Sequence, residues 1–537
     1  MDLLLELFSE EIPARMQLHA VDHLKTIIKD GLIESNLTFS NVRGYATPRR
    51  LAISVEGLPK AQPDVKEERR GPRADAPEKA IKGFLKANGV ILNQCEKRNT
   101  GKGEFWFVVI EQKGLSTASV IKNMLPETIY KLQWPKSMRW GDGSFRWVRP
   151  LRRVMCVLDG EWLPIEVGEG IPCSNTTSGH RFMSSGLFEV NSFAEYQNQL
   201  ERFKVVLDAA NRMKLIEAKS IELAKADGFT LKNDSGLLAE VCGLVEWPVP
   251  LLGKIDDDFM SLPDEVLTTS MRSHQKYFSV LGKDGKLAPR FVMVANIETT
   301  DEGAEIIRGN ERVLRARLAD AKFFWDQDLK NTLESRVPSL GQMMFHERLG
   351  SLYQKVERLK NLCKQIAQTI NADPEKSMRA AYLCKADLMT GMVGEFANLQ
   401  GVMGYYYALT DGEVTEVAHA IKEHYAPAGP DDSCPTAPVS VAISIADKID
   451  TLVGFFGMDE RPTGSRDPYG LRRSALGIIR LILENKLNLE LSWLVATSRK
   501  QYPDDCVLVL KDFEVILTNF FIDRLKVYLR TQGVRHD

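Results

Sequence analysis

Four side chains in the second half of the sequence could together hold a divalent metal ion. They are His346, Asp387, His424 and Asp447. Imidazole nitrogens and carboxylate oxygens bind divalent cations, and a bound cation lowers the pKa of a water molecule that it carries. Hydrolysis by metal-bound water is therefore one chemistry that these residue types allow.

The spacing of these four residues resembles that of HD-domain phosphohydrolases. In those proteins a helical bundle brings an early His, an adjacent His-Asp pair and a distal Asp onto one metal. Here the adjacent pair reads Ala386-Asp387, and an alanine cannot donate to a metal. Because loss of a ligand weakens a metal site, we expect a degenerate HD-like bundle without bound metal. An HD-type metal-dependent phosphohydrolase remains an alternative.

Other catalytic signatures are missing from the sequence. It contains no Walker-type GxxxxGK[ST], no GxGxxG after a strand and no HExxH. It also contains neither the HIGH-like and KMSKS-like strings of one aminoacyl-tRNA synthetase class nor a convincing set of the other class's motifs. No nucleophile-base-acid trio surrounds His180 or His274. We therefore predict no catalytic residue in this chain.

The richest basic segment runs from Lys136 to Arg153. Six cations face a single acid, Asp142, and three aromatic residues lie among them. Arginine offers forked donors to phosphate, and an aromatic face can stack on an unpaired base. We take Arg139, Trp140, Arg149 and Arg152 as candidate contacts to RNA or to a partner subunit. The alternative is a basic strand pair whose tryptophans fill a core.

Two further basic sites are candidates for the same contacts. His180 and Arg181 lie in Ser178-Gly179-His180-Arg181-Phe182, where a phosphate or ribose contact competes with a turn histidine satisfied by backbone. Arg308, Arg312 and Arg315 recur at helical spacing on one face. Arg312 and Arg315 could grip phosphate, whereas the alternative is a charged outer face that pairs with Glu311 and Asp320.

The elements around these residues predict α+β structure in the first half and mainly α structure in the second. β-leaning runs at 51–55 and 105–110 alternate with a helical pattern at 81–87, and the charged stretch 59–77 is typical of a solvated loop. A helical run from 193 to about 227 precedes strand signals at 243–252 and 290–297, with a turn at 283–286 between them. From about Arg312 to Arg530 helical spacing dominates.

Composition limits the class of protein. The formal net charge is −2, with 70 Lys+Arg against 72 Asp+Glu, so any nucleic-acid site must be local. The acidic N-terminus lacks the features of a secretion signal, and no run approaches the roughly 18 apolar residues of a membrane span. The eight cysteines, from Cys95 to Cys506, include no CxxC pair. We expect a cytoplasmic protein with reduced cysteines and no membrane contact.

Six strings in order along the chain resemble the β chain of bacterial glycyl-tRNA synthetase. Each string alone is moderately specific, and together they are highly specific. The strings are residues 3–13 (LLLELFSEEIP), 46–51 (ATPRRL), 138–141 (MRWG), 179–182 (GHRF), 309–328 and 462–468 (PTGSRDP).

The resemblance implies an α2β2 assembly in which the α chain carries the ATP, Mg and glycine site and the β chain binds tRNA(Gly). This chain would need no cofactor of its own. A non-catalytic scaffold for the α subunit is a second alternative.

The resemblance also implies four regions. They are an N-terminal α+β domain at 1–160, a second α+β region at 161–330 that resembles the editing-type domain of phenylalanyl-tRNA synthetase β chains, an HD-like helical domain at 331–460, and a helical linker at 461–537. The linker would lead to a mostly absent anticodon-binding domain. The chain is therefore expected to be a C-terminally truncated form.

Overall fold

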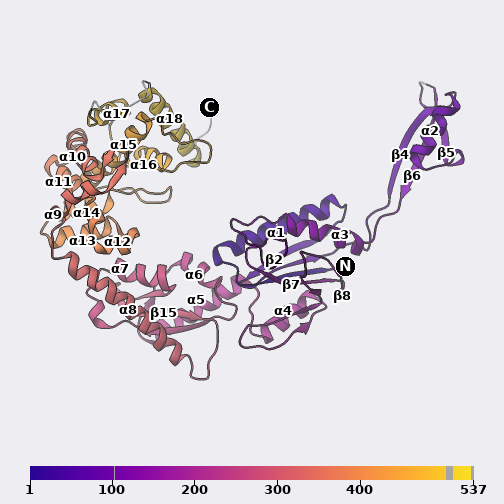
Figure 1. The fold of residues 1–537 in the computed structure, drawn as a ribbon, viewed down its shortest axis with the longest axis horizontal. Helices are drawn as coiled ribbons and strands as arrows, with labels where there is room; N and C mark the ends of the chain where they lie inside the picture. Colours follow the sequence, from indigo (N-terminus) through magenta and orange to yellow (C-terminus); the bar gives the residue numbers. More distant parts are fainter. Residues whose placement is uncertain (102, 504–511, 534–537) are drawn as a thin grey trace. The chain divides into compact units, whose positions relative to one another are not determined.

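The computed structural model describes residues 1–101, 103–503 and 512–533 (Figure 1). The chain divides into two compact units, Met1–Lys254 with Lys276–Glu311 and Ile255–Gln275 with Arg312–Asp537. The four-part division expected from the sequence remains a prediction.

The first unit is built on a sheet in which strand β1 (Leu3–Ser9) is central. The strand order is β2-β3-β1-β7-β8, and β9 also pairs with β7. Neighbours are antiparallel except β7 and β9, which are parallel. The other strands are β2 (Asn41–Thr47), β3 (Arg50–Glu56), β7 (Leu151–Leu158), β8 (Glu161–Trp162) and β9 (Cys173–Ser174).

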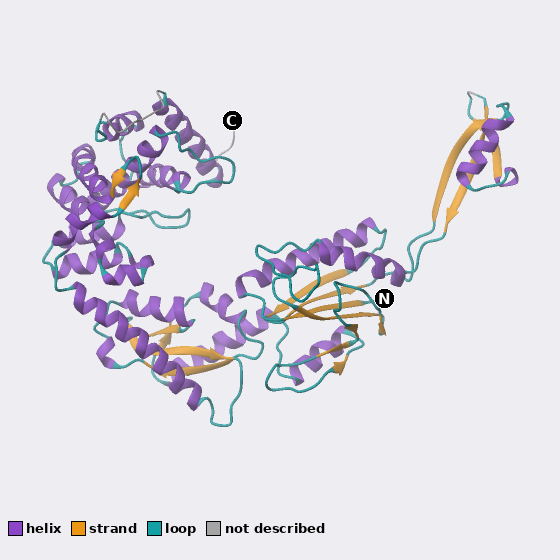
Figure 2. Cartoon of the chain, viewed as in Figure 1, coloured by secondary structure: helices purple, strands orange, loops and turns teal. Residues whose placement is uncertain are grey.

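Side chains alternate in direction along β1, so that they pack into two cores on opposite faces of the sheet. Leu3, Leu5 and Leu7 pack with helices α1 (Ala14–Glu34) and α3 (Thr117–Tyr130). Leu4 packs on the opposite face with helix α4 (Phe193–Arg202). Figure 2 shows helices on both faces of this sheet. All seven residues of β1 are buried. A charged residue at an even position of this strand therefore needs a partner inside the protein.

A small three-stranded sheet follows, in the order β4-β6-β5, with strands β4 (Val65–Arg73), β6 (Glu104–Gln112) and β5 (Cys95–Asn99). Helix α2 (Glu78–Asn88) packs against β4, and the 3-10 turn η1 (Leu92–Gln94) precedes β5. Gly71 allows this contact, because a Cβ there would lie 2.7 Å from the ring of Phe84. The prediction of β structure at 105–110 is confirmed.

The prediction of a loop over 59–77 is wrong for residues 65–73, which form β4. Their mixed charges do not prevent pairing, because β4 lies antiparallel to β6 along most of its length. The guanidinium of Arg70 lies 3.7 Å from the centre of the Phe105 ring. Such a contact gives an exposed charged strand an apolar surface to cover.

A second sheet in the first unit has the order β12-β14-β15-β13. Helix α5 (Ala209–Ala226) and helix α6 (Ser235–Cys242) pack with it around one core. The strands are β12 (Thr230–Leu231), β13 (Val249–Lys254), β14 (Phe278–Leu281) and β15 (Leu287–Ala295), and a short pair β10 (Thr176–Thr177) and β11 (Phe188–Glu189) lies nearby in sequence. The predicted turn at 283–286 joins β14 to β15.

Two expectations for this region are corrected. The single helix from 193 to about 227 is wrong: α4 and α5 are separate, Lys204 adopts a positive φ of 60°, and the Asp208 side chain caps the new helix. The strand expected at 243–252 begins only at Val249, because the backbone N–H groups of Glu246 and Trp247 donate to the Asn296 side chain instead of a strand.

The second unit is mainly helical, as predicted. Among its described residues the only strands are the short pair β16 (Met344–His346) and β17 (Gly350–Ser351). Its helices are α7 (Asp264–Thr269), α9 (Leu333–Arg336), α10 (Leu352–Thr369), α11 (Pro374–Leu383), α12 (Gly391–Glu395), α13 (Val402–Thr410), α14 (Thr415–Glu423), α15 (Pro438–Gly457), α16 (Leu471–Glu484), α17 (Leu491–Arg499) and α18 (Phe513–Thr531), with short turns η2 (Asp257–Phe259), η3 (Ser270–Gln275), η4 (Val337–Gln342), η5 (Ala386–Met389) and η6 (Ala397–Leu399).

Helix α15 is the centre of this unit. Nearly all of its residues are buried, and it packs against α10, α14, α16 and α17. The long helix α8 (Ala304–Asp328) begins in the first unit and ends in the second. None of the helices in the described ranges is long and apolar enough to cross a membrane. The described cysteines form no disulfide, and Cys506 lies outside the described residues.

Candidate functional site

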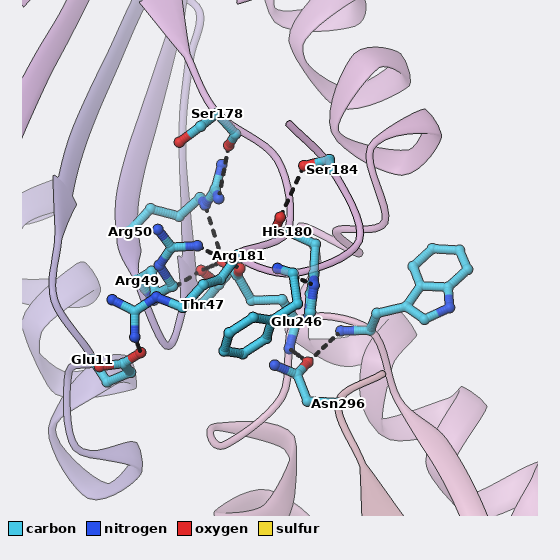
Figure 3. A network of polar contacts seen from close by, with 12 residues as sticks. Glu11, Thr47, Arg49, Arg50, Ser178, His180, Arg181, Ser184, Glu246 and Asn296 are labelled. Carbon is cyan, nitrogen blue, oxygen red and sulfur yellow. Dashed lines mark hydrogen bonds and ion pairs between the residues drawn. The ribbon is translucent and has the colours of Figure 1, made fainter. Parts of the chain in front are cut away.

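Three of the six strings quoted above meet in the first unit around the guanidinium of Arg50 (Figure 3). Arg50 has no exposed surface. Its Nη1 donates to Glu6 over 3.2 Å, its Nε donates to Glu246 over 3.2 Å, and its Nη2 donates to the Ser178 carbonyl over 3.1 Å. One buried cation thus connects β1, the start of β3, the segment before His180 and the residues that precede β13.

Both carboxylates that face Arg50 have further donors. Glu6 accepts from the hydroxyls of Thr177 and Tyr196, and Glu246 accepts from the Thr47 hydroxyl over 2.7 Å. Burial by itself would raise the pKa of Glu246, but Arg50 and Arg49 outweigh it and hold that pKa below its usual value. The network is therefore hydrogen-bonded and closed to solvent, which suits a structural role better than a reaction centre.

His180 lies beside this network and is almost fully buried. Its Nδ1 accepts from the backbone N–H groups of Phe182 and Met183, each over 3.2 Å. The proton of the neutral ring is therefore on Nε2. Burial lowers the pKa of His180, so the ring stays neutral. Of the two environments considered from the sequence, this geometry is that of a turn histidine satisfied by backbone.

Arg181 and Arg152 lie at the exposed edge of the same region, where they share acids of the first string. Arg181 pairs with Glu11 over 2.6 Å and with Glu10 over 2.5 Å, and Arg152 pairs with Glu10 over 2.9 Å. The two arginines are thus held close together by Glu10. Exposed pairs of this kind contribute little stability, but they occupy the donors that a phosphate would need.

The segment 136–149, named the basic loop here, separates its aromatic residues from its cations. Met138 and Trp147 form a β-bridge, and Trp147 is 1% exposed. The rings of Phe145 and Trp147 stack in the core, whereas half-buried Trp140 contacts Phe145 edge-on at 5.9 Å. The core-filling alternative therefore describes Phe145 and Trp147, and only Trp140 retains an accessible ring.

The cations of the basic loop point outward. Lys136, Arg139 and Arg149 are exposed, and none has a hydrogen bond or ion pair with another residue in the described ranges. Arg146 donates only to the uncharged Ser137. Uncompensated arginines on a surface are free to bind an external anion such as phosphate.

In the described part of the chain, some arginines of α8 pair with acids and others do not. Arg315 makes a two-pronged contact with Asp256 at 2.5 and 3.0 Å, and Arg308 pairs with Glu305. Glu311, one of the partners expected from the sequence, accepts from the backbone N–H of Lys254 over 2.9 Å. Arg312 is exposed and has no ion pair within the described part of the chain.

The four residues of the HD-like pattern do not converge on one point. His424 and Asp447 meet, but through an ammonium: Lys385 Nζ lies 2.9 Å from His424 Nε2 and 3.0 Å from Asp447 Oδ2. His346 instead lies 3.5 Å from Glu460 and packs against the Phe455 ring. Over the described residues, no three His, Cys, Asp or Glu side chains are grouped so that they could hold a metal ion. The residues present do not fit an HD-type metal centre.

Asp387 forms hydrogen bonds with the backbone. Its Oδ2 accepts from the backbone N–H groups of Gly401 and Gly404, while its buried Oδ1 has no hydrogen-bond partner. Burial raises the pKa of Asp387 to about 6 despite these two donors. The carboxyl therefore connects the turn η5 to the start of α13, and its negative charge at neutral pH destabilises the fold.

Several of these residues could not be chosen from motifs. Glu6 and Glu246 carry a weak signal, because each is a lone acid inside an apolar run, Leu-Leu-Leu-Glu-Leu-Phe and Leu-Val-Glu-Trp. Such an acid is buried only with a partner. Lys385 gives no comparable signal, since its neighbourhood depends on α14 and α15, which are distant in sequence.

Replacing Arg50 with methionine should lower the free energy of unfolding by about 3–5 kcal/mol, because two buried carboxylates lose their cation. Urea denaturation followed by tryptophan fluorescence measures this loss. The matched control is Arg43→Met on β2, where the exposed pair with Glu56 predicts a loss below about 1 kcal/mol. Equal effects of the two substitutions would show that the buried network carries no special weight.

Replacing Asp387 with asparagine should make the protein more stable at pH 7.5 and leave it unchanged near pH 4. The folded pKa of about 6 lies above the usual value of roughly 4, so the native carboxyl stabilises the fold only when protonated. That contribution is lost as the pH rises from about 4 through 6. The difference of about 2 between the folded and the usual pKa corresponds to about 3 kcal/mol of unfolding free energy.

Melting temperatures of Asp387→Asn and of the unsubstituted protein at both pH values provide the measurement. The exposed Asp431→Asn serves as the control and should change neither value. A stability difference that is larger at pH 4 than at pH 7.5 would contradict the assigned direction of the pKa shift.

Comparison with known proteins agrees with the family resemblance that the sequence strings indicate. The family described as glycyl-tRNA synthetase beta subunit matches residues 3–537. The glycine--tRNA ligase beta subunits of Rhodospirillum centenum and Paracoccus denitrificans are each 48% identical to this chain, over all of the chain and 78% of the relative. That of Dinoroseobacter shibae is 47% identical over all of the chain and 79% of the relative. This chain therefore belongs to the glycyl-tRNA synthetase beta subunit family.

Proposed function

We propose that this chain binds tRNA(Gly) and positions it for ATP-dependent glycylation at the active site of a separate α subunit. Membership of the family and the names of the relatives support a subunit of glycine–tRNA ligase. The lack of nucleotide-binding motifs in the sequence agrees with ATP and Mg being used by the α subunit. The contribution of this chain is then orientation, since holding one reactant in place lowers the entropic part of the barrier.

The observation that carries the RNA proposal is the set of unpaired cations on the basic loop. Lys136, Arg139 and Arg149 have no acid to neutralise them within the described residues, so phosphates are their natural partners. Trp140 lies among them with a partly accessible ring that an unpaired base could stack on. Arg312 on α8 is a second unpaired cation of the same kind.

The remaining candidates have a different role in this proposal. Arg152, Arg181 and Arg315 already pair with acids, and His180 is buried. We assign them to the structure that supports the contact surface. No residue of this chain is assigned a step in the ligase chemistry.

The finer organisation also belongs to the proposal. We propose an α2β2 assembly in the cytoplasm. The regions of this chain would be an α+β domain at 1–160, an editing-type domain like that of phenylalanyl-tRNA synthetase β chains within 161–330, an HD-like bundle within 331–460 and a helical linker from 461 toward an anticodon-binding domain. Buried salt bridges of α15 with α10 support an inert, charge-stabilised bundle. They do not favour the phosphohydrolase alternative.

The double substitution Arg139→Gln and Arg149→Gln should weaken binding of tRNA(Gly) by about tenfold or more at moderate salt. It should also reduce the slope of log affinity against log salt concentration by about 2, because two phosphate contacts are lost. Filter binding of the whole chain across a salt series measures both quantities.

Lys25→Gln with Arg43→Gln is the matched control, since it removes two exposed cations that pair with Asp22 and Glu56. The control should retain the affinity and slope of the unsubstituted chain. Equal affinities for both double variants would reject the basic loop as the contact. Unchanged RNA binding with reduced association of the α subunit would instead establish the scaffold alternative.

A further inference from the structure

The ammonium of Lys385 lies at the meeting point of two residues from the HD-like pattern. Lys385 is 4% exposed, and its Nζ lies 2.9 Å from His424 Nε2 and 3.0 Å from Asp447 Oδ2. The ammonium also lies 3.9 Å from the centre of the Tyr425 ring. A buried positive charge is thus surrounded by an imidazole, a carboxylate and an aromatic face, each of which attracts a cation.

His424 is oriented as a metal-binding histidine is. Its Nδ1 lies 2.7 Å from the Ile421 carbonyl, so Nδ1 carries the proton and donates it to that oxygen. Nε2 is then a lone-pair donor directed at Lys385. Metal-ligating histidines use the same arrangement, in which a backbone carbonyl fixes the ring and the other nitrogen faces the cation.

From this geometry we infer that Lys385 takes the place of the metal ion in the HD-like bundle. Its ammonium binds the lone pair of His424 and the charge of Asp447, so a cation that is part of the chain holds α14 and α15 together. The sequence implied a bundle weakened by the missing histidine at Ala386. In this proposal Lys385 supplies the positive charge that a metal ion would supply.

The charges around this point leave little room for a second cation. Asp447 also faces Lys355 over 3.1 Å, and Asp450 is held by Lys355 and Arg358. Lys448 donates to the backbone carbonyls of residues 424–426, which belong to the end of α14 and the turn after it. Three cations therefore pair with the two aspartates, and Lys448 binds backbone carbonyls.

Asp387, the acid of the degenerate pair, forms hydrogen bonds with another part of the bundle. Its Oδ2 accepts from the backbone N–H groups of Gly401 and Gly404. Asp447 is already paired with the ammonium groups of Lys355 and Lys385, at 3.1 and 3.0 Å. A divalent ion would be repelled by these two lysines.

Metal analysis of the purified whole chain tests the inference without any substitution. We expect far less than one equivalent of Mn, Fe, Co, Ni or Zn per chain, and we expect EDTA to leave the melting temperature unchanged. One equivalent of bound metal, with a lower melting temperature after its removal, would overturn the inference.

Substitution of Lys385 separates a metal surrogate from an ordinary ion pair. Lys385→Met should lower the melting temperature on the order of 10 °C, because Asp447 and His424 lose a buried partner. Lys385→Ala vacates the position of the ammonium, and Zn²⁺ at about 0.1 mM should raise its melting temperature by several degrees as the metal binds the two freed ligands. Zn²⁺ should not stabilise the unsubstituted chain.

The matched control is Lys376→Ala on α11, an exposed lysine that pairs with Glu416. This variant should melt within about 2 °C of the unsubstituted chain, as expected for an exposed pair, and should gain no response to Zn²⁺. If Lys385→Ala and the control respond alike to Zn²⁺, or if Lys385→Met melts like the unsubstituted chain, Lys385 does not act in place of a metal. Should Lys385 variants fail to fold, the metal analysis alone decides.

Discussion

A single buried guanidinium constrains the first unit more than any other group. Arg50 has no exposed surface and lies between Glu6 and Glu246, each at 3.2 Å. A buried charge is tolerated only when it is paired and hydrogen-bonded. The register of β1 against β3 and the position of the segment before β13 must therefore satisfy one cation together. The basic loop leads into β7, which pairs with β1 in the same sheet.

In the proposed function, the paired charges support the structure and the unpaired charges bind RNA. Arg50, Arg181 and Arg315 have acids within the chain, and so do the lysines and arginine around Asp447 and Asp450. Arg139, Arg149 and Arg312 have none among the described residues. A protein with a net charge of −2 can bind a polyanion only through cations that it leaves unneutralised. The candidates named from charge alone thus divide into two groups with different roles.

Apolar spacing predicted the fold class because burial imposes that spacing locally. Strands β3 and β6 and the helical second half lie where the spacing places them. The prediction failed where a side chain replaces a strand as hydrogen-bond partner. The Asn296 side chain accepts from the backbone N–H groups of residues 246 and 247. The prediction also failed at β4, whose partner strand supplies the apolar surface that β4 itself lacks. Candidate arginines were visible in the sequence, but their acids were not. Asp256 and Glu10 are 59 and 171 residues from the arginines they bind, and no local pattern reports such distances.

In the proposed division of labour this chain grips tRNA while another polypeptide activates glycine with ATP. Aminoacylation of tRNA(Gly) with radiolabelled glycine, measured for this chain alone, for the α subunit alone and for their mixture, tests that division most directly. Charging should occur in the mixture, be absent with this chain alone, and be slower with the α subunit alone by on the order of a hundredfold or more. Charging by this chain unaided, or equal rates for the α subunit alone and for the mixture, would contradict it.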